Sequence, residues 1–437
     1  MSTYLLCSTP LYGHVVPLVT IGRRLVEHGH RVLLLTGSVF ADRVRAAGLE
    51  FRPLRGAADF DERDPGTYVP DLDRYRGLRL SRYQVEQTFV RPIPDQFRAV
   101  RAILDAEGVD AVLVDCVFAG ILPLLTAAPG TRPPVLAAGI MPLAQTSRDV
   151  APYNTALPPS STRLGRLRNR TLNAVGRRVL FAPTQRLADQ LVRDVGGTGL
   201  GDSFVMDLSR LFDRFLQLGP AEFEYPRSDL SPNLRFVGPV LPGHGGASLP
   251  DWWSELDDGR PVVHVTQGTL DTDDFTKLVR PTLDALADDD VHVLVSTGRR
   301  PVEAVGPTPA NARVAEFLPY DALLPRTDVV VTNGGFGGTL QALAAGVPLV
   351  VAGAAEDKPE TAARVAHFGL GIDLRTGRPS AERVRRAVHD VLADPSWRAR
   401  TTALAATMAG YDALDAVVDE LERAVAARRE AGGRRAG

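Results

Sequence analysis

Short apolar runs alternate with helical patterns along the first part of the chain. Short buried strands separated by helices that end near a glycine, such as Gly29 or Gly48, are typical of a parallel sheet with helices on both faces. Residues 8–17 are predicted to form a loop, and the polar stretch 55–92 to be irregular. The predicted strands are 4–7, 31–36 and 111–115, and the predicted helices are about 18–29, 41–47, 93–107 and 118–126.

A second alternating pattern follows a weakly patterned middle region, 139–215, which is expected to wrap the front of the first domain. Residues 238–250 contain four glycines and three prolines, a composition that suits a linker between domains. A final helical stretch is predicted over 397–428. The strands predicted for the second half are 262–266, 291–296, 312–317, 329–332 and 349–352.

Two such patterns predict an α/β protein made of two doubly wound domains that face each other across a cleft. The predicted domains are 1–238 and 255–400, joined by a linker over 239–254. Residues 401–430 are expected to form a helix that returns to pack on the first domain. Ligands of open α/β sheets bind at the carboxyl ends of the strands, so the cleft is the expected site.

Composition excludes several classes of protein. Of the 437 residues, 44% are hydrophobic and 23% charged, and the net charge is −2, which gives no sign of nucleic-acid binding. Cys7 and Cys116 have no metal-ligand spacing and are expected to be buried free thiols. The sequence shows neither a charged leader nor an apolar run that would cross a bilayer, so a cytoplasmic protein without membrane insertion is expected.

A glycine cluster, N-G-G-F-G-G over residues 333–338, lies where a predicted strand turns into a predicted helix. Glycine permits positive φ and close backbone approach, and the free N–H groups of a helix N-terminus attract phosphate. A tight turn without a ligand is the alternative. Because the cluster lies at the carboxyl end of a strand, the phosphate interpretation is favoured.

A dinucleotide-binding site is disfavoured by the segment after the first strand. That site requires G-x-G-x-x-G, whereas Ser8-Thr-Pro-Leu-Tyr-Gly-His14 contains only Gly13. A hydride-transfer enzyme is therefore not expected.

The stretch 333–365 resembles the donor motif of nucleotide-sugar-dependent glycosyltransferases, within the bacterial natural-product branch of the UDP-glycosyltransferase superfamily. The family pattern H-G-G-x-G-T-x-x-E-A-L-x-x-G-V-P, followed by D-Q-x-x-N-A-x-R-V, corresponds here to N-G-G-F-G-G-T-L-Q-A-L-A-A-G-V-P and D-K-P-E-T-A-A-R-V. The resemblance implies the GT-B fold, two facing Rossmann-like domains with an interdomain cleft. It is weak over 55–92 and 140–235.

The resemblance also implies roles for donor-binding residues. Asn333 stands where the family has a histidine that faces the diphosphate, and Gln341 where a glutamate binds the ribose. Thr269 matches a Ser/Thr near the phosphates, and Phe317 replaces a tryptophan that stacks on the base, with core packing as the alternative. The backbone N–H groups implied to bind phosphate belong to Gly334, Gly335, Gly337 and Gly338.

Asp357 and Lys358 stand where the family binds the hydroxyls of the donor sugar with Asp-Gln or Glu-Gln. A lysine at this position would bond hydroxyl oxygens, pair with a sugar carboxylate, or lie against Asp357 or Glu360. Orientation toward solvent is the remaining alternative. The departures from the family pattern at Asn333, Phe317, Gln341 and Lys358 leave the nucleotide and the sugar open.

His14, in the segment G-H-V-V-P, matches the histidine that acts as the general base of the family. Asp115 ends another strand and matches the acid that orients this histidine. Histidine titrates near neutrality, so it can take the proton of an acceptor hydroxyl, and a carboxylate on its other nitrogen fixes the tautomer. A structural or solvated histidine is the alternative.

The sequence therefore predicts an inverting glycosyltransferase that moves a sugar from a UDP- or dTDP-sugar to a hydroxyl of a small, largely apolar acceptor. No metal or other cofactor is expected, because Asp71-x-Asp73 and Asp271-x-Asp273 are interpreted as solvated turns. The expected partners are the nucleotide-sugar and the small acceptor, and a homodimer stays open. Two alternatives are a non-catalytic auxiliary homologue and a sugar-nucleotide epimerase.

Overall fold

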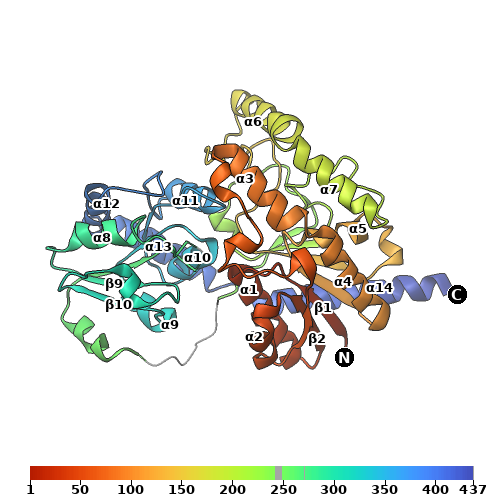
Figure 1. Cartoon of the computed structure of the whole chain (residues 1–437), viewed down its shortest axis with the longest axis horizontal. Helices are drawn as coiled ribbons and strands as arrows, with labels where there is room; N and C mark the ends of the chain where they lie inside the picture. The colour runs from red at the N-terminus through yellow and green to blue at the C-terminus, as the bar shows by residue number, and fades with distance from the viewer. Residues whose placement is uncertain (242–248, 270, 437) are drawn as a thin grey trace.

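Two parallel sheets form two lobes that lie side by side in Figure 1. The computed structural model describes residues 1–241, 249–269 and 271–436. The first lobe holds a seven-stranded sheet in the order β3-β2-β1-β4-β5-β6-β7, and the second a six-stranded sheet in the order β10-β9-β8-β11-β12-β13. The predicted α/β class with two doubly wound sheets is confirmed. The predicted linker, 239–254, falls in part on residues outside the described ranges.

All strand pairs of the first sheet are parallel, and Leu5 of β1 lies opposite both Leu33 of β2 and Val112 of β4. The strands are β1 (Thr3–Cys7), β2 (Arg31–Thr36), β3 (Glu50–Pro53), β4 (Ala111–Asp115), β5 (Val135–Gly139), β6 (Arg214–Gln217) and β7 (Leu234–Phe236). The helices of this lobe are α1 (Tyr12–Glu27), α2 (Ala41–Ala46), α3 (Gly77–Val85), α4 (Ile93–Ala106), α5 (Leu122–Leu125), α6 (Arg163–Val175) and α7 (Ala182–Asp194).

The second sheet is also parallel, with Val330 of β11 opposite His264 of β8 and Leu349 of β12. Its strands are β8 (Val262–Thr266), β9 (His292–Ser296), β10 (Ala312–Ala315), β11 (Val329–Thr332), β12 (Leu349–Val351) and β13 (Gly371–Asp373). The helices that follow Asp257 are α8 (Val279–Leu286), α9 (Tyr320–Leu323), α10 (Phe336–Ala344), α11 (Lys358–His367), α12 (Ala381–Ala393), α13 (Pro395–Met408) and α14 (Ala413–Ala436).

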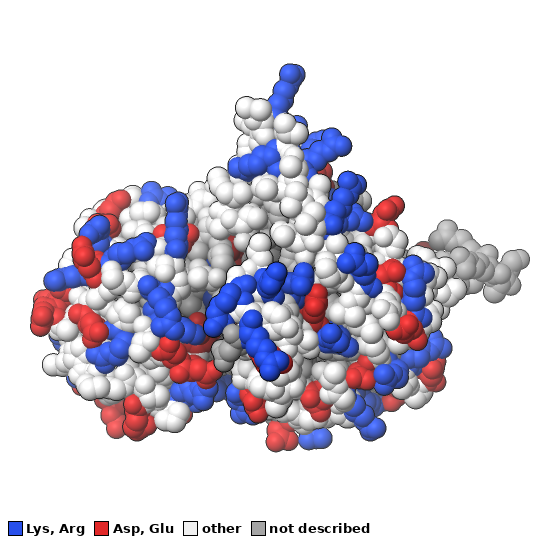
Figure 2. Space-filling view, turned by 45° about the horizontal axis from the view of Figure 1, so that its top comes forward, with Lys and Arg blue, Asp and Glu red and all other residues white. Residues whose placement is uncertain are grey.

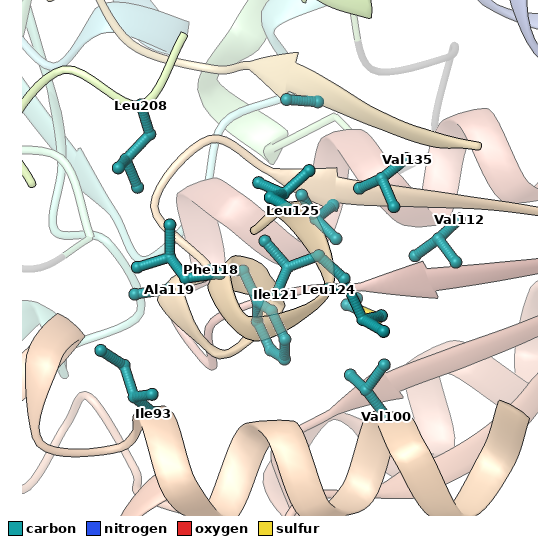
Figure 3. Packing of buried hydrophobic residues seen from close by; sticks show 14 of the residues in the cluster. Ile93, Val100, Val112, Phe118, Ala119, Ile121, Leu124, Leu125, Val135 and Leu208 are labelled. Atoms are coloured by element: carbon teal, nitrogen blue, oxygen red, sulfur yellow. The ribbon is translucent and has the colours of Figure 1, made fainter. Parts of the chain in front are cut away.

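The first sheet is buried on both faces, which explains why β4 is apolar up to its last residue. On one face, Phe118, Ile121 and Leu124 pack in the same cluster as Val100 of α4, as Figure 3 shows. The connection after β4 is thereby fixed, and the end of β4 with it.

The C-terminal helices belong to different lobes. Helix α13 packs on α10 of the second lobe, whereas α14 packs on α1 of the first. Val417 and Leu421 of α14 are fully buried in the cluster beneath β1, and Asp415 accepts a hydrogen bond of 2.6 Å from Arg24 of α1. The single helical stretch predicted over 397–428 is therefore two helices, because the chain breaks at Gly410, a residue of low helix propensity.

A buried cluster of ion pairs joins the two lobes. Arg364 of α11, 1% exposed, lies 2.8 Å from Glu224 of the first lobe and 2.9 Å from Glu360 of its own helix. Arg227 lies 2.6 Å from the same Glu224 carboxylate. Burial alone would raise the pKa of Glu224, but the two guanidinium groups hold this pKa below its usual value. The four charges sum to zero, so each one is compensated within the interface.

Two predictions of secondary structure are wrong in the first lobe. Helix α1 begins at Tyr12, so His14 lies in its first turn and not in a loop. Pro17 lies inside this helix, whereas proline in a helical pattern usually marks a boundary. Within the stretch predicted to be irregular, α3 and a π-helical turn (Glu86–Val90) form. Helix α3 has no buried residue, so its sequence lacks the apolar periodicity from which a helix is predicted.

Sequence patterns also missed β3, β5, β6, β7 and β13. Four of these are edge or near-edge strands of three or four residues, too short to show a period. Among the described residues, none of the helices combines the length and the apolar character needed to cross a bilayer.

Candidate active site

A cavity of about 900 Å³ lies between the lobes. It is lined by the N-terminal turn of α1, the connection after β4, and residues at the carboxyl ends of β8, β9 and β11. The carboxyl ends of both sheets therefore meet at this cavity, as the doubly wound pattern predicts.

His14 and Asp115 are brought together although they are far apart in sequence. His14 Nδ1 lies 3.5 Å from Asp115 Oδ2, and the Asp115 side chain is fully buried. Thr9 N–H donates to Oδ2 at 2.6 Å and Val117 N–H donates to Oδ1 at 2.8 Å. Two backbone donors thus hold the carboxylate in place behind the imidazole, which itself lines the cavity.

An aromatic side chain that the sequence did not single out lies beside His14. The ring of Phe89 is stacked on the imidazole, with centroids 6.5 Å apart and an interplanar angle of 21°. Phe89 belongs to the π-helical turn, and such turns are frequent at functional sites. The apolar face of Phe89 and the polar edge of His14 therefore border the same space.

The glycine cluster forms the predicted turn between β11 and α10. Gly334 has φ +88°, and a Cβ there would lie 2.7 Å from Val351 Cγ1, so glycine is required at this position. Gly335, Gly337 and Gly338 line the cavity, whereas Gly334 packs against β12 behind them. Asn333 is buried, and its amide donates to the backbone oxygen of Gln267.

The other predicted donor residues also line the cavity. Phe317 is 58% exposed, which excludes the core-packing alternative for this residue. Thr269 and Gln341 line the cavity as well, and Gln341 Nε2 donates to the Gly337 oxygen at 3.3 Å. An exposed aromatic ring at a cavity edge is available for stacking on a ligand.

Lys358 does not point to solvent. Its side chain is buried and forms an ion pair with Glu356, a residue that the sequence did not single out. Glu360 instead bonds Arg364. Burial raises the pKa of the neighbouring Asp357 to about 6, and the charge of Glu356 adds to this rise. The sugar-binding position predicted for Asp357 and Lys358 thus contains two carboxylates and one ammonium group.

The chain is similar over nearly its full length to proteins of known activity. It is 41% identical to 4'-demethylrebeccamycin synthase of Lentzea aerocolonigenes, over 96% of this chain and 98% of that protein. It is 38% identical to UDP-glycosyltransferase 2 of Phaeomoniella chlamydospora, over 97% and 96% of the two chains. This protein belongs to the UDP-glycosyltransferase superfamily. Within this superfamily the protein falls in the natural-product branch, so the predicted family and the predicted class of enzyme are confirmed.

A match to a family model agrees with this assignment, and two solved structures show the same fold. The sequence model described as erythromycin biosynthesis protein CIII-like, C-terminal domain, matches residues 280–424 of the glycosyltransferase. The solved structure of CalG4, the calicheamicin glycosyltransferase, superposes with a TM-score of 0.73 at 24% identity and covers 98% of both chains. That of spinosyn rhamnosyltransferase SpnG with thymidine diphosphate superposes with a TM-score of 0.68 at 20% identity, over 97% of this chain and all of that one. The predicted GT-B fold is confirmed.

Glu62 is a further titratable group of the glycosyltransferase cavity. Its carboxylate accepts a hydrogen bond of 2.7 Å from the backbone N–H of Tyr12, at the start of the helix that carries His14. Burial raises the pKa of Glu62 from 4.5 to about 7. It lies in the segment predicted to be irregular, where no sequence pattern distinguishes it from other surface acids.

The Glu62→Gln variant of the glycosyltransferase is expected to be more stable than the wild type at pH 8 and equally stable near pH 4. A carboxyl whose pKa is raised on folding contributes stability below its unfolded value, near 4.5, and this contribution is lost as the pH rises through about 7. The difference at pH 8 should be on the order of 2–3 kcal/mol. Unfolding midpoints from pH 4 to 8.5 measure it; a constant difference between the two proteins over this range would contradict the prediction.

Proposed function

We propose that this glycosyltransferase transfers a sugar, with inversion, from a UDP- or dTDP-sugar to a hydroxyl of a small, largely apolar acceptor. The observation that carries the proposal is the pair formed by His14, which lines the cavity, and the buried Asp115 behind it, 3.5 Å apart. The cavity is large enough for a donor and an acceptor of drug-like size.

In the proposed reaction His14 Nε2 removes the proton of the acceptor hydroxyl as its oxygen attacks the anomeric carbon. The bond from that carbon to the phosphate oxygen breaks on the opposite side, which inverts the configuration in one step. Asp115, beside Nδ1, stabilises the imidazolium cation that forms. Because two backbone N–H groups already hold this carboxylate, little reorganisation is required during the proton transfer.

The leaving nucleoside diphosphate would lie at the N-terminus of α10. The backbone of Gly335, Gly337 and Gly338 borders the cavity there, and the helix dipole favours negative charge. Phe317 would stack on the base, Gln341 would bind the ribose, and Thr269 and Asn333 would lie near the phosphates. Two donor nucleotides are proposed. The relative named UDP-glycosyltransferase 2 supports a UDP-sugar, and the complex of SpnG with thymidine diphosphate supports a dTDP-sugar.

The acceptor would occupy the part of the cavity that belongs to the first lobe. This part surrounds Phe89 and His14 and is predominantly apolar, so it suits an acceptor with a large apolar surface. The apolar side chains that line it are Val85, Phe89, Met141, Leu143, Val205, Met206 and Phe215.

The proposed function is tested by incubating the protein with UDP- and dTDP-sugars and a panel of apolar phenols and alcohols, in excess EDTA. A β-linked product from an α-linked donor is expected, at the same rate with and without EDTA, because helix N–H groups are proposed to hold the diphosphate. Asp271 forms an ion pair with Lys277, and Asp273 forms one with Arg300, so this Asp-x-Asp pair is not expected to bind a metal. Loss of activity in EDTA, restored by Mn²⁺ or Mg²⁺, would contradict the metal-free mechanism, and retention of configuration would contradict inversion.

Lys358→Gln is expected to change the order in which donor sugars are used. The ammonium group and Glu356 border the proposed sugar position, and glutamine offers a neutral donor and acceptor in place of the charge. A charge-assisted hydrogen bond contributes about 1.5–3 kcal/mol, so the ratio between two sugars should shift about ten- to a hundredfold. Competition between nucleotide-sugars measures this shift, with Lys277→Gln as the control. An unchanged order would remove Lys358 from sugar recognition.

A further inference from the structure

An apolar stripe on the outside of the first lobe is not explained by glycosyl transfer. Leu164, Leu167, Val175 and Val179 recur at helical spacing along α6 and the π-helical turn that follows it, Gly176–Leu180. Leu164 is 80%, Leu167 60% and Val179 64% exposed. None of these residues lines the cavity. Several large apolar side chains exposed on one side of the same element, with Thr171 between them, are typical of an interaction surface.

The charged residues of the segment that carries the stripe are all positive. Residues 163–180 contain six arginines and no acidic residue. Arg163, Arg170 and Arg178 are exposed and form no ion pair with a described residue. In Figure 2 the ridge at the top of the molecule, where α6 lies in Figure 1, shows blue and white side chains with little red. The surface is therefore complementary to a negatively charged partner.

The opposite side of α6 is fixed to the first lobe. Arg166 lies 2.8 Å from the carboxylate of Asp149, and Asn169 Nδ2 donates to the Arg148 oxygen at 3.0 Å. The helix is thus held rigidly, with its apolar and cationic side outward on a convex ridge. A convex ridge gives a second globular protein little surface to enclose, whereas an amphipathic helix of this composition suits the interface of an anionic bilayer.

We propose that α6 and the turn after it dock this protein on an anionic lipid surface, with the leucine and valine side chains among the headgroups and Arg163, Arg170 and Arg178 on lipid phosphates. The docking is peripheral and does not depend on the proposed reaction. The backbone that α6 holds at Arg148 continues from the cavity-lining segment 140–145. The acceptor side of the cavity is therefore attached to the surface that faces lipid.

The test is co-sedimentation of the full chain with vesicles of phosphatidylcholine, with and without phosphatidylglycerol. Binding only to the anionic vesicles, weakening as salt rises, is expected. Each arginine near a bilayer contributes about fivefold, so R163Q/R170Q/R178Q should bind about a hundredfold less tightly. L164Q/L167Q/V179Q should also lose binding. The matched control R45Q/R386Q/R423Q removes the same charge from other exposed positions and should lose much less.

Several results would overturn the proposal. These are no binding of the wild type to anionic vesicles, equal binding to neutral ones, or equal losses in the arginine variant and its control. A wild type that ignores vesicles but dimerises, and that L164Q/L167Q/V179Q makes monomeric in light scattering, would identify a self-association face instead. Unfolding midpoints establish that the variants are folded, and the arginine variant, which alters only exposed side chains, decides the matter if the apolar variant does not fold.

Discussion

Replacing His14 with alanine is expected to lower kcat about 10²–10⁴-fold while the affinity for the nucleotide-sugar stays nearly unchanged. The loss is that of a general base, and the base acts on the acceptor and not on the donor. Steady-state rates and thermal shift with the donor measure the two quantities separately. The control is His28→Ala at the other end of the same helix, where the side chain lies beside Asp415 and away from the cavity.

Asp115→Asn extends this prediction to the pair. The asparagine keeps the shape of the side chain but loses the negative charge beside Nδ1, so kcat should fall in the same direction. The double variant should lose less than the product of the two single losses, because the residues act together. Near-normal turnover of His14→Ala, or independent losses in the double variant, would remove the pair from the mechanism.

Arg364→Met is expected to destabilise the protein by about 3–5 kcal/mol, the typical result of breaking a buried ion pair from one side. Glu360 would lose the guanidinium with which it forms an ion pair, and Glu224 would lose one of its two, both in the buried interface between the lobes. Urea and thermal unfolding measure the loss. Arg101→Met, which removes an exposed pair with Asp105 on α4, should cost no more than about 1 kcal/mol.

A second variant separates the charge from the packing of the Arg364 side chain. If uncompensated charge is the cause, Glu360→Gln combined with Arg364→Met should lose less stability than Arg364→Met alone. Equal losses in the single and double variants, or a loss as small as that of Arg101→Met, would show that the cluster contributes through shape only.

The elements that the sequence predicted well are those with strong apolar runs. Strands such as β4 and β8 are buried along their whole length, so their largely apolar sequences predict both a strand and its burial. Short edge strands and α3 lack such a pattern, because β3 and β7 have no fully buried residue and α3 has none either. Helix α1 was predicted to begin too late because Pro17 reads as a boundary.

Among the site residues, the sequence located those that match an extended family motif. It did not locate those that reach the cavity through tertiary packing alone. His14 and Asp115 were paired only through the resemblance to the family, since nothing local connects them. Glu62, Phe89 and Glu356 lie in the cavity with no sequence signal, because each is placed there by tertiary packing of a segment without regular apolar spacing. That these three residues lie in the cavity could be established only from the structure.

The return of α14 to the first lobe has a consequence for synthesis on the ribosome. The cluster beneath β1 includes Val417 and Leu421, so an apolar face of α1 stays uncovered until the last helix has been made. About 180 residues separate Phe236, where the first sheet ends, from Ala413. At about 5–20 residues per second this is a delay of roughly ten to forty seconds, during which the nascent first lobe offers an apolar surface to chaperones.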